Sequence, residues 1–305
     1  MDTIDSRARL RIAFLGIGLM GQPMALRLLQ AGYPLTVWNR SAAKVQPLLE
    51  YGAQPASTPA QAVAHADLVL TMLADGSVVG EVIEQAWPGL RTGVLVVDMS
   101  STRQDEAQQL QARLAQRQVR FVDAPVSGGV AGAAAGTLAI MAGAAPEDFE
   151  AARSVFDCLG RATLVGAVGC GQLAKLCNQL IVGGTLNIVA EALLLAQAGG
   201  ADPAAVRAAL RGGFADSRVL EVHGQRMLER DFMPGGQVKS QLKDLENTLL
   251  AARAAALKLP LTELVTARYR TLLARMPQAD QAAALLALEQ LNPAWRLGSG
   301  PDRLP

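Results

Sequence analysis

The sequence predicts an α/β protein in which a doubly wound parallel sheet is followed by an all-α domain, with a long helix joining the two. Short apolar runs alternate with amphipathic runs over the first half of the chain. These short runs are apolar on both faces, which is typical of strands covered by helices on both sides. From about Gly171 to Leu291, Ala- and Leu-rich helical patterns replace them. We therefore expect domains at 1–168 and 169–292, followed by a Pro- and Gly-rich, poorly ordered tail at 293–305.

The expected strands follow one another along the first domain, with amphipathic segments between them. The first helix, "PMALRLLQAG", is closed by Gly32, and a later one is expected over 103–117. The strand-like runs are "RIAFLGIG", "PLTVWNR", "ADLVLTML", "GVLVVDMS", "VRFVDAPVS", "LAIMAGA" and "ATLVGAVG".

Bulk composition narrows the class of partner. The chain of 305 residues is 50% hydrophobic and 18% charged, with a formal net charge of +1. This balance gives no electrostatic case for nucleic acid or for a membrane surface. Aromatic residues make up only 4% of the chain, so base-stacking platforms are not expected either. The composition favours a small-molecule partner.

Cysteine usage and the chain's apolar stretches indicate the compartment. Three cysteines without a regular framework favour a reducing environment. The first ten residues hold no apolar core of a secretory signal. The most apolar stretch, 173–200, contains Lys175, Asn178, Asn187 and Glu191, which fits a buried helix of a soluble protein better than a bilayer span. We expect a cytoplasmic protein.

A glycine motif lies between the first expected strand and the first helix. Gly16 permits a tight turn, Gly18 lets the backbone approach a pyrophosphate, and Gly21 allows the helix to pack closely on the strand. Because the motif follows a strand and opens a helix, it is the fingerprint of a Rossmann dinucleotide-binding domain. A glycine-rich turn without a ligand is the alternative. The expected cofactor contacts are Gly16, Ile17, Gly18, Leu19, Met20 and Gly21.

The end of the second expected strand distinguishes between the two nicotinamide cofactors. A carboxylate there would bind the ribose 2′-hydroxyl, but this chain has Asn39, Arg40 and Ser41. A guanidinium and a hydroxyl suit a 2′-phosphate, so these residues favour NADP, with NAD remaining possible. The alternative is that Arg40 and Lys44 are merely solvated at a helix start.

Hydride transfer involving a carbonyl needs a group that manages the hydroxyl proton. The chain has two histidines, of which His65 is expected at the surface and His223 in the helical half. No tyrosine has a lysine four residues later, and the few His and Cys residues do not form a metal site. Lys175 remains, three residues before Asn178 on the same expected helix face. A lysine whose ammonium extends to solvent is the alternative.

Four segments together resemble the β-hydroxyacid dehydrogenase family, which includes 3-hydroxyisobutyrate dehydrogenases and tartronate semialdehyde reductases. They are "FLGIGLMGQPMALRLLQAG", "DAPVSGG", "GCGQLAKLCNQ" and "KDL", and the resemblance covers about residues 11–290. It implies that Lys175 is the catalytic acid and base and that family members are homodimers or homotetramers. It further implies substrate contacts at Ser127, Gly128, Gly129 and Asn178, and cofactor contacts at Leu73, Ala74, Ser101 and Lys243.

The chain also departs from the family pattern. Ala74 stands where relatives commonly have proline, and Gly236 where tartronate semialdehyde reductases have an aromatic residue. Together with the nearby cation Lys239, Gly236 suggests a wider acceptor pocket that takes a longer or doubly charged acid. The "RGG" at 211–213 resembles tartronate semialdehyde reductases, whereas Ser217 and Arg218 fit a substrate, a partner subunit or the surface equally.

The resulting expectation is an NADP-preferring enzyme that interconverts a short 3-hydroxy acid and its semialdehyde, most similar to tartronate semialdehyde (2-hydroxy-3-oxopropionate) reductase. The alternatives are a 3-hydroxyisobutyrate dehydrogenase or an enzyme for a larger 3-hydroxy acid. An imine reductase is disfavoured by Lys175, and a 6-phosphogluconate dehydrogenase by the short helical part. A non-catalytic NADP-binding sensor is the competitor from another class.

Overall fold

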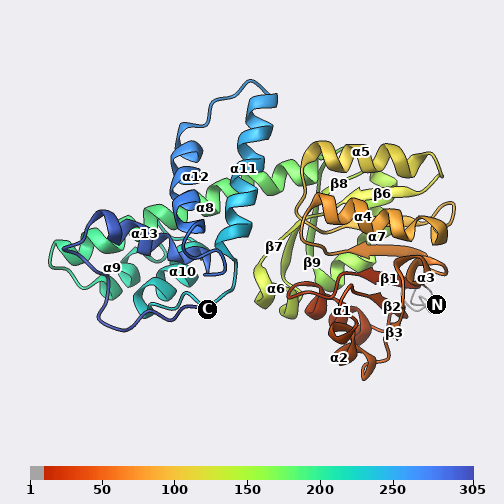
Figure 1. Ribbon diagram of the computed structural model, residues 1–305, viewed down its shortest axis with the longest axis horizontal. Helices are drawn as coiled ribbons and strands as arrows, with labels where there is room; N and C mark the ends of the chain where they lie inside the picture. The colour runs from red at the N-terminus through yellow and green to blue at the C-terminus, as the bar shows by residue number, and fades with distance from the viewer. Residues whose placement is uncertain (1–9) are drawn as a thin grey trace. The chain divides into compact units, whose positions relative to one another are not determined.

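A computed structural model describes residues 10–305 of the chain. The chain divides into two compact units, Met1–Lys175 and Leu176–Pro305. The long helix α8 (Cys170–Ala198) begins in the first unit and continues into the second (Figure 1). The expected boundary after residue 168 lies just before this helix.

The first unit is built on one sheet whose strands match the expected apolar runs. Its order is β3-β2-β1-β4-β5-β6-β8-β7, with β9 paired to β8. From β3 to β6 all pairs are parallel, and the chain reverses its direction of strand addition between β1 and β4. In sheets of this kind, ligands bind beyond the carboxyl ends of the strands at that switch point. The strands are β1 (Ile12–Leu15), β2 (Leu35–Trp38), β3 (Gln54–Pro55), β4 (Leu68–Thr71), β5 (Leu95–Asp98), β6 (Arg120–Asp123), β7 (Val126–Ser127), β8 (Leu138–Gly143) and β9 (Gly160–Gly166).

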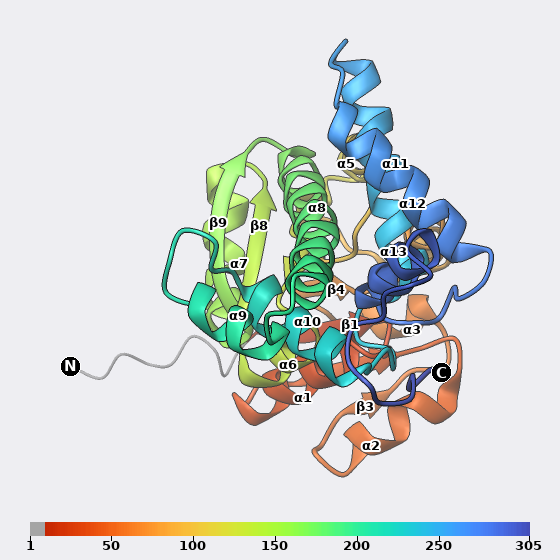
Figure 2. The same ribbon diagram turned by 90° about the vertical axis from the view of Figure 1, so that its left-hand side faces the viewer.

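The sheet differs from the expected parallel pattern at β8. This strand pairs antiparallel with β6 and β7, and parallel with β9, which lies beside it in Figure 2. Only residues 128–137 connect β7 to β8, including the short helix α6 (Gly129–Ala135). A parallel connection needs a longer crossover, so the chain turns back at Gly136, which has φ 68°.

Helices cover both faces of the sheet. Ile12 and Phe14 of β1 pack into one apolar cluster, and Ala13 and Leu15 pack into another on the opposite face. This alternation places all four residues in the interior, as their uninterrupted apolar run predicts. Three helices contribute side chains to the first cluster: α1 (Gly21–Gln30), α6 and α7 (Pro146–Leu159). Three others contribute to the second cluster: α3 (Pro59–Val63), α4 (Gly76–Ala86) and α5 (Gln104–Ala115) (Figure 1).

The second unit is helical, as expected from its Ala- and Leu-rich patterns. Leu186 and Leu193 of α8 enter an apolar core with Phe232, Tyr269 and Leu285. Helices α11 and α12 lie side by side in both views of the ribbon (Figures 1 and 2). The helices after α8 are α9 (Pro203–Leu210), α10 (Arg218–Glu229), α11 (Val238–Ala254), α12 (Pro260–Leu273) and α13 (Ala284–Leu291).

The carboxyl-terminal segment differs from the poorly ordered tail that its composition predicts. The side chain of Arg230 is 1% exposed, donates a hydrogen bond to the Leu297 carbonyl at 2.6 Å and pairs with Asp302. The amide of Phe232 donates to the Arg303 carbonyl at 2.9 Å, and Leu297 is fully buried. A buried guanidinium needs acceptors, and this segment supplies them, which explains its fixed course.

Helix α8 is long and apolar enough to cross a membrane by length and composition alone. It nevertheless places the polar residues Lys175 and Asn187 among its buried positions, and its leucines form part of the second unit's core. The core helix of a soluble protein passes the same test. The three cysteines are free, with Cys158 buried and Cys177 exposed.

Candidate active site

The glycine motif forms a tight loop between β1 and α1. Gly16 has φ 109°, in the region that favours glycine, and a Cβ on Gly21 would lie 1.9 Å from the Gly16 carbonyl oxygen. A Cβ on Gly18, in contrast, would meet nothing within 4 Å. The loop is therefore packed closely against its own helix while its backbone stays open at Gly18, which leaves room for a close ligand.

Asn39 joins this loop to the end of the neighbouring strand β2. Its Oδ1 accepts a hydrogen bond from the Ile17 amide at 3.0 Å, and its Nδ2 donates to the Ser41 carbonyl at 3.0 Å. Arg40 and Ser41 are exposed just beyond β2, and Lys44 is exposed nearby. The cations and hydroxyl that the sequence singled out thus lie next to the glycine loop, with no carboxylate at that strand end.

The segments after β4 and β5 complete the same edge of the sheet. The Leu73 amide donates to the Ser100 Oγ at 2.9 Å, which joins the two segments. Ala74 is exposed and Ser101 is half-buried. Since β4 is the neighbour of β1, these residues share the edge that carries the glycine loop. The open backbone at Gly18 and the cations beyond β2 fit a phosphorylated dinucleotide bound along this edge.

Lys175 lies against the segment that contains the expected substrate loop. Its side chain is among the buried ones, 9% exposed, and its Nζ donates to the Val126 carbonyl at 2.9 Å. The next residue, Ser127, is half-buried, and the exposed Gly128 and Gly129 have φ 138° and 63°. Both glycines adopt conformations that side-chain-bearing residues rarely take. The structure thus places the predicted catalytic lysine one residue from the predicted substrate loop.

In the second unit, a chain of polar contacts links Asn178 to Lys243. The Asn178 Nδ2 donates to the Gln179 Oε1 at 2.8 Å, and the Gln179 Nε2 donates to the Asp244 Oδ2 at 2.8 Å. The Asp244 carboxylate in turn pairs with Lys243 at 3.4 Å. Gln241 strengthens the link, because its Nε2 donates to the Gln179 carbonyl and its Oε1 accepts from the Gln179 side chain, both at 3.0 Å.

Two glutamines of helix α8 were not singled out by sequence reasoning. Gln172 is fully buried, and Gln179 is half-buried and engaged on both sides. They stand seven residues apart, one turn on either side of Lys175, and interrupt the same apolar run. The sequence signal that could have identified them is the regular spacing of polar residues within an otherwise apolar helix.

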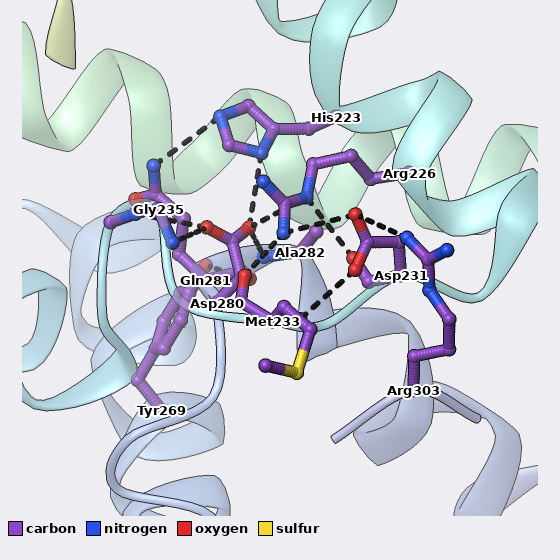
Figure 3. A network of polar contacts seen from close by, with 11 residues as sticks. His223, Arg226, Asp231, Met233, Gly235, Tyr269, Asp280, Gln281, Ala282 and Arg303 are labelled. Atoms are coloured by element: carbon purple, nitrogen blue, oxygen red, sulfur yellow. Dashed lines mark hydrogen bonds and ion pairs between the residues drawn. The ribbon is translucent and has the colours of Figure 1, made fainter. Parts of the chain in front are cut away.

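Gly236 belongs to a loop that the buried carboxylate of Asp280 holds in place; Figure 3 shows this carboxylate beside Gly235 and His223. The Asp280 Oδ2 accepts from the amides of Gly235 and Gly236 at 3.1 and 2.9 Å, and its Oδ1 lies 3.3 Å from the His223 Nδ1. Burial alone would raise the pKa of Asp280, but the hydrogen bond and charge of His223 and the Ala282 amide lower it below the usual value. A Cβ on Gly236 would lie 3.0 Å from the Gln281 Nε2, so the loop passes close to its neighbour there.

The remaining candidates make other contacts or none of those described above. His65 is exposed in the turn after α3, as expected, and Lys239 is exposed on the first turn of α11. His223 takes part in the Asp280 contacts of the loop rather than in contacts to the lysines. Across residues 10–305, no three His, Cys, Asp or Glu side chains come together as metal ligands would.

Comparison with known proteins gives matches over nearly the whole chain. A family model described as the NAD binding domain of 6-phosphogluconate dehydrogenase matches residues 11–170. A second, described as NAD-binding of NADP-dependent 3-hydroxyisobutyrate dehydrogenase, matches residues 169–288. The chain is 40% identical over 285 residues to 2-hydroxy-3-oxopropionate reductase of Escherichia coli (strain K12), covering 92% of this chain and 97% of that one.

Solved structures agree with these matches. Mycobacterium tuberculosis 3-hydroxyisobutyrate dehydrogenase with L-serine has a TM-score of 0.83 at 28% identity, covering 92% of this chain and 99% of that one. Psf3 in complex with NADP+ and 2-OPP also has a TM-score of 0.83, at 26% identity, covering 91% and 99% of the two chains. The matched proteins share both units of this chain.

Proposed function

We propose that this chain, which belongs to the β-hydroxyacid dehydrogenase family, reduces 2-hydroxy-3-oxopropionate (tartronate semialdehyde) with NADPH. As a member of that family it is an NAD(P)-dependent 3-hydroxyacid dehydrogenase. The observation that carries this proposal is the hydrogen bond between Lys175 and the carbonyl of Val126, directly before Ser127. It brings a proton donor next to a loop suited to a small carboxylate. The 40% identity to a 2-hydroxy-3-oxopropionate reductase supports this choice of substrate within the family.

In the proposed reaction, NADPH supplies the hydride when it is bound. Ser127 and the backbone at Gly128 and Gly129 hold the substrate carboxylate, a neutral way of binding an anion. The Lys175 Nζ delivers its proton to the carbonyl oxygen as negative charge develops there, and takes it back in the reverse direction. Asn178, on the same helix, orients the substrate, while Lys243 is assigned to the cofactor by resemblance alone.

The preference for NADPH is proposed from the residues beyond β2. Arg40, Ser41 and Lys44 are exposed beside the glycine loop, and a 2′-phosphate would gain charge-assisted hydrogen bonds from them. Asn39 cannot repel that phosphate as a carboxylate would, and its side chain is already engaged with the loop. NADH would bind in the same place without the additional contacts.

The acceptor pocket is proposed to be wider than that of the smallest-substrate enzymes, because Gly236 offers no side chain. The variant Gly236→Phe tests this by narrowing the pocket. Any side chain at this position brings a Cβ close to the Gln281 side-chain amide. Gly236→Ala adds that contact without the ring, so it serves as the control. A loss of activity on longer acids in the Phe variant alone supports the wider pocket, whereas unchanged activity on short and long acids contradicts it.

We further propose a soluble, cytoplasmic homodimer or homotetramer. Exposed apolar side chains of α8 recur every seven residues at Ile181, Ile188 and Leu195, so they lie along one face of the helix. A face of this kind is suited to a second copy of the chain. Light scattering of the purified protein measures the assembly, and a monomer would contradict this part of the proposal.

The proposed activity is tested by initial rates with 2-hydroxy-3-oxopropionate, methylmalonate semialdehyde and longer semialdehydes, with each nicotinamide cofactor. We expect the highest kcat/KM for 2-hydroxy-3-oxopropionate with NADPH. A higher value for methylmalonate semialdehyde would instead assign 3-hydroxyisobutyrate as the hydroxy acid. NADPH binding without turnover of any semialdehyde would favour the sensor, and turnover of a cyclic imine alone would favour an imine reductase.

A further inference from the structure

A buried carboxylate holds the first turn of the helix that carries Lys175. Asp123, the last residue of β6, is fully buried. Its Oδ1 accepts a hydrogen bond from the Gly169 amide at 2.7 Å, and its Oδ2 accepts one from the Gln172 amide at 2.8 Å. The amides at a helix start lack partners within the helix, so this carboxylate satisfies donors that would otherwise be unpaired.

The surroundings of Asp123 are shaped to admit this carboxylate. A Cβ on Gly143 would lie 2.5 Å from the Asp123 Oδ1, and one on Gly171 would lie 2.7 Å from its Oδ2. Gly169 has φ 92°, which turns its amide toward the same carboxylate. Gly143 of β8 and Gly171 of α8 thus leave the space that the Asp123 carboxylate fills, and Gly169, just before α8, turns its amide toward it.

Gln172 attaches the same helical turn to a second segment. Its Oε1 accepts from the Thr102 amide at 2.9 Å, and its Nε2 donates to the Ser100 carbonyl at 2.9 Å. Ser101, an expected cofactor contact, lies between these two residues. The start of α8 is therefore bonded both to the segment after β5 and to the last residue of β6.

Lys175 follows one helical turn later and returns to the segment that begins at Asp123. It lies three residues beyond Gln172, a rise of about 4.5 Å along the helix. Its Nζ donates to the Val126 carbonyl, three residues beyond Asp123. The segment 123–126 thus fixes this lysine at two points, through the backbone of its helix and through its ammonium.

From this arrangement we propose that Asp123 and Gln172 are positioning residues. They fix the position of Lys175 relative to the proposed substrate loop at 127–129 and to the segment 100–102 after β5. This inference rests on the proposed function, because it concerns the lysine that moves the proton. Both residues are fully buried, so they are assigned no contact with substrate. Because a misplacement of about 1 Å in a catalytic group can reduce a rate by about 100-fold, loosening this turn is expected to slow the chemical step specifically.

The ionisation of Asp123 supports the same role. The pKa of Asp123 is raised to about 7: burial is the largest cause, the charge of Asp98 adds to the rise, and the amides of Gly169 and Gln172 oppose it. The charged group that acts on this pKa is Asp98 on β5, which itself accepts hydrogen bonds from the Thr71 hydroxyl and the Ser100 amide. A protonated Asp123 accepts one amide less well, so positioning should weaken as the pH falls through about 7.

The test compares Asp123→Asn, Gln172→Met and the control Asp148→Asn. The Asn side chain keeps the shape of Asp123 but presents one acceptor, and Met fills the space of Gln172 without its hydrogen bonds. Asp148 is a partly buried carboxylate of the same unit. It pairs with Arg120 and takes no part in the bonds described above, so it serves as the control. The readouts are kcat, KM, the dissociation constant of NADPH and the primary isotope effect with deuterated NADPH.

We expect kcat to fall about 100-fold in Asp123→Asn and by a smaller factor in Gln172→Met. The isotope effect should rise because the chemical step becomes slower, while the NADPH dissociation constant changes little. The acid limb of the kcat–pH profile near pH 7 should disappear in Asp123→Asn. An unchanged kcat and isotope effect per folded molecule would overturn the inference, as would an equal loss in the Asp148→Asn control.

A readout without turnover separates this inference from the proposed function. The rate of reductive methylation of Lys175, measured by peptide mass spectrometry, is compared with that of the exposed Lys258 in the folded proteins. We expect about tenfold faster labelling of Lys175 in Asp123→Asn than in the wild type or Asp148→Asn, because the fixed ammonium is released. Faster labelling with no semialdehyde turnover by the wild type would reject the function and keep the inference. Equal labelling in all three proteins would reject the inference.

Discussion

The ammonium of Lys175 and the backbone carbonyl of Val126 are joined by a hydrogen bond of 2.9 Å. This bond connects the start of helix α8 to the residue that precedes Ser127. The proposed acid–base group and the proposed substrate loop are thereby held one residue apart by a backbone contact. In the proposed reaction, Nζ exchanges this carbonyl for the substrate oxygen when the proton is transferred.

Removal of the ammonium should abolish most of the activity. We expect Lys175→Ala to lower kcat by about 10²- to 10⁴-fold, the range of general acid–base catalysis. Initial rates with a semialdehyde measure the loss, and the NADPH dissociation constant should stay near the wild-type value. The control Lys258→Ala removes an exposed lysine of the second unit and should leave both unchanged. Full activity in Lys175→Ala would exclude its role as the proton donor.

Two glycine substitutions should separate cofactor binding from folding. A methyl group on Gly18 meets no protein atom within 4 Å, whereas one on Gly21 would lie 1.9 Å from the Gly16 carbonyl. We expect Gly18→Ala to keep the wild-type thermal midpoint but to bind NADPH roughly tenfold more weakly, because the methyl occupies the path of the pyrophosphate. Gly21→Ala should lose about 1–3 kcal/mol of stability through overpacking. Calorimetry measures both quantities, and unchanged NADPH binding in Gly18→Ala would contradict this placement of the cofactor.

Arg40 should contribute to the choice of cofactor. We expect Arg40→Ala to raise the KM for NADPH by about 10- to 100-fold, the effect of losing a hydrogen bond to a charged group. The KM for NADH should change little, because NADH lacks the 2′-phosphate. Arg161→Ala, an exposed arginine on β9, serves as the control. Equal effects on the two cofactors would show that Arg40 does not contact that phosphate.

Arg230 should anchor the carboxyl-terminal segment and stabilise the second unit. Its 1% exposed guanidinium pairs with Glu289 at 2.8 Å and with Asp302. We expect Arg230→Met to cost about 3–5 kcal/mol in urea unfolding, because Glu289 and Asp302 lose a buried partner. The double variant with Glu289→Gln should recover part of the loss. A loss below about 1 kcal/mol, the range of exposed pairs, would contradict this role.

The contribution of Asp302 should depend on pH. Burial alone would raise the pKa of Asp302, but the hydrogen bond and charge of Arg230 lower it below the model-peptide value of 3.8. The native state therefore binds this proton less tightly than the unfolded state. The stabilisation is present above about pH 4 and is lost as the pH falls through the lowered pKa. Unfolding curves of the wild type and Asp302→Asn should converge under acid conditions, and a constant difference would contradict the pairing.

The sequence predicted the fold class because its main elements carry local signals. Runs such as "IAFL" are apolar at every position, and this pattern indicates a strand buried on both faces. The exposed two-residue strand β3 has no such pattern and is defined by its pairing with β2. The fixed course of the tail was likewise hidden, because Arg230 and Asp302 lie far apart in the sequence.

The candidate site was predictable as a set of residues and less so as an arrangement. Lys175 stood out because a charge interrupts an apolar helix, and the glycine motif because of its place between strand and helix. The contact of Lys175 with Val126 and the carboxylate–amide bonds of Asp123 depend on tertiary packing. Asp123 was visible only as part of a motif, since its burial cannot be seen from its neighbours in sequence.

Initial rates of NADPH and NADH oxidation with 2-hydroxy-3-oxopropionate, in the wild type and in Lys175→Ala, test the proposed reaction most directly. We expect rapid turnover by the wild type, a higher kcat/KM with NADPH than with NADH, and a loss of at least about 100-fold in Lys175→Ala. Failure of the wild type to turn over this substrate, despite NADPH binding, would contradict the proposed substrate. Turnover that persists in Lys175→Ala would contradict the mechanism.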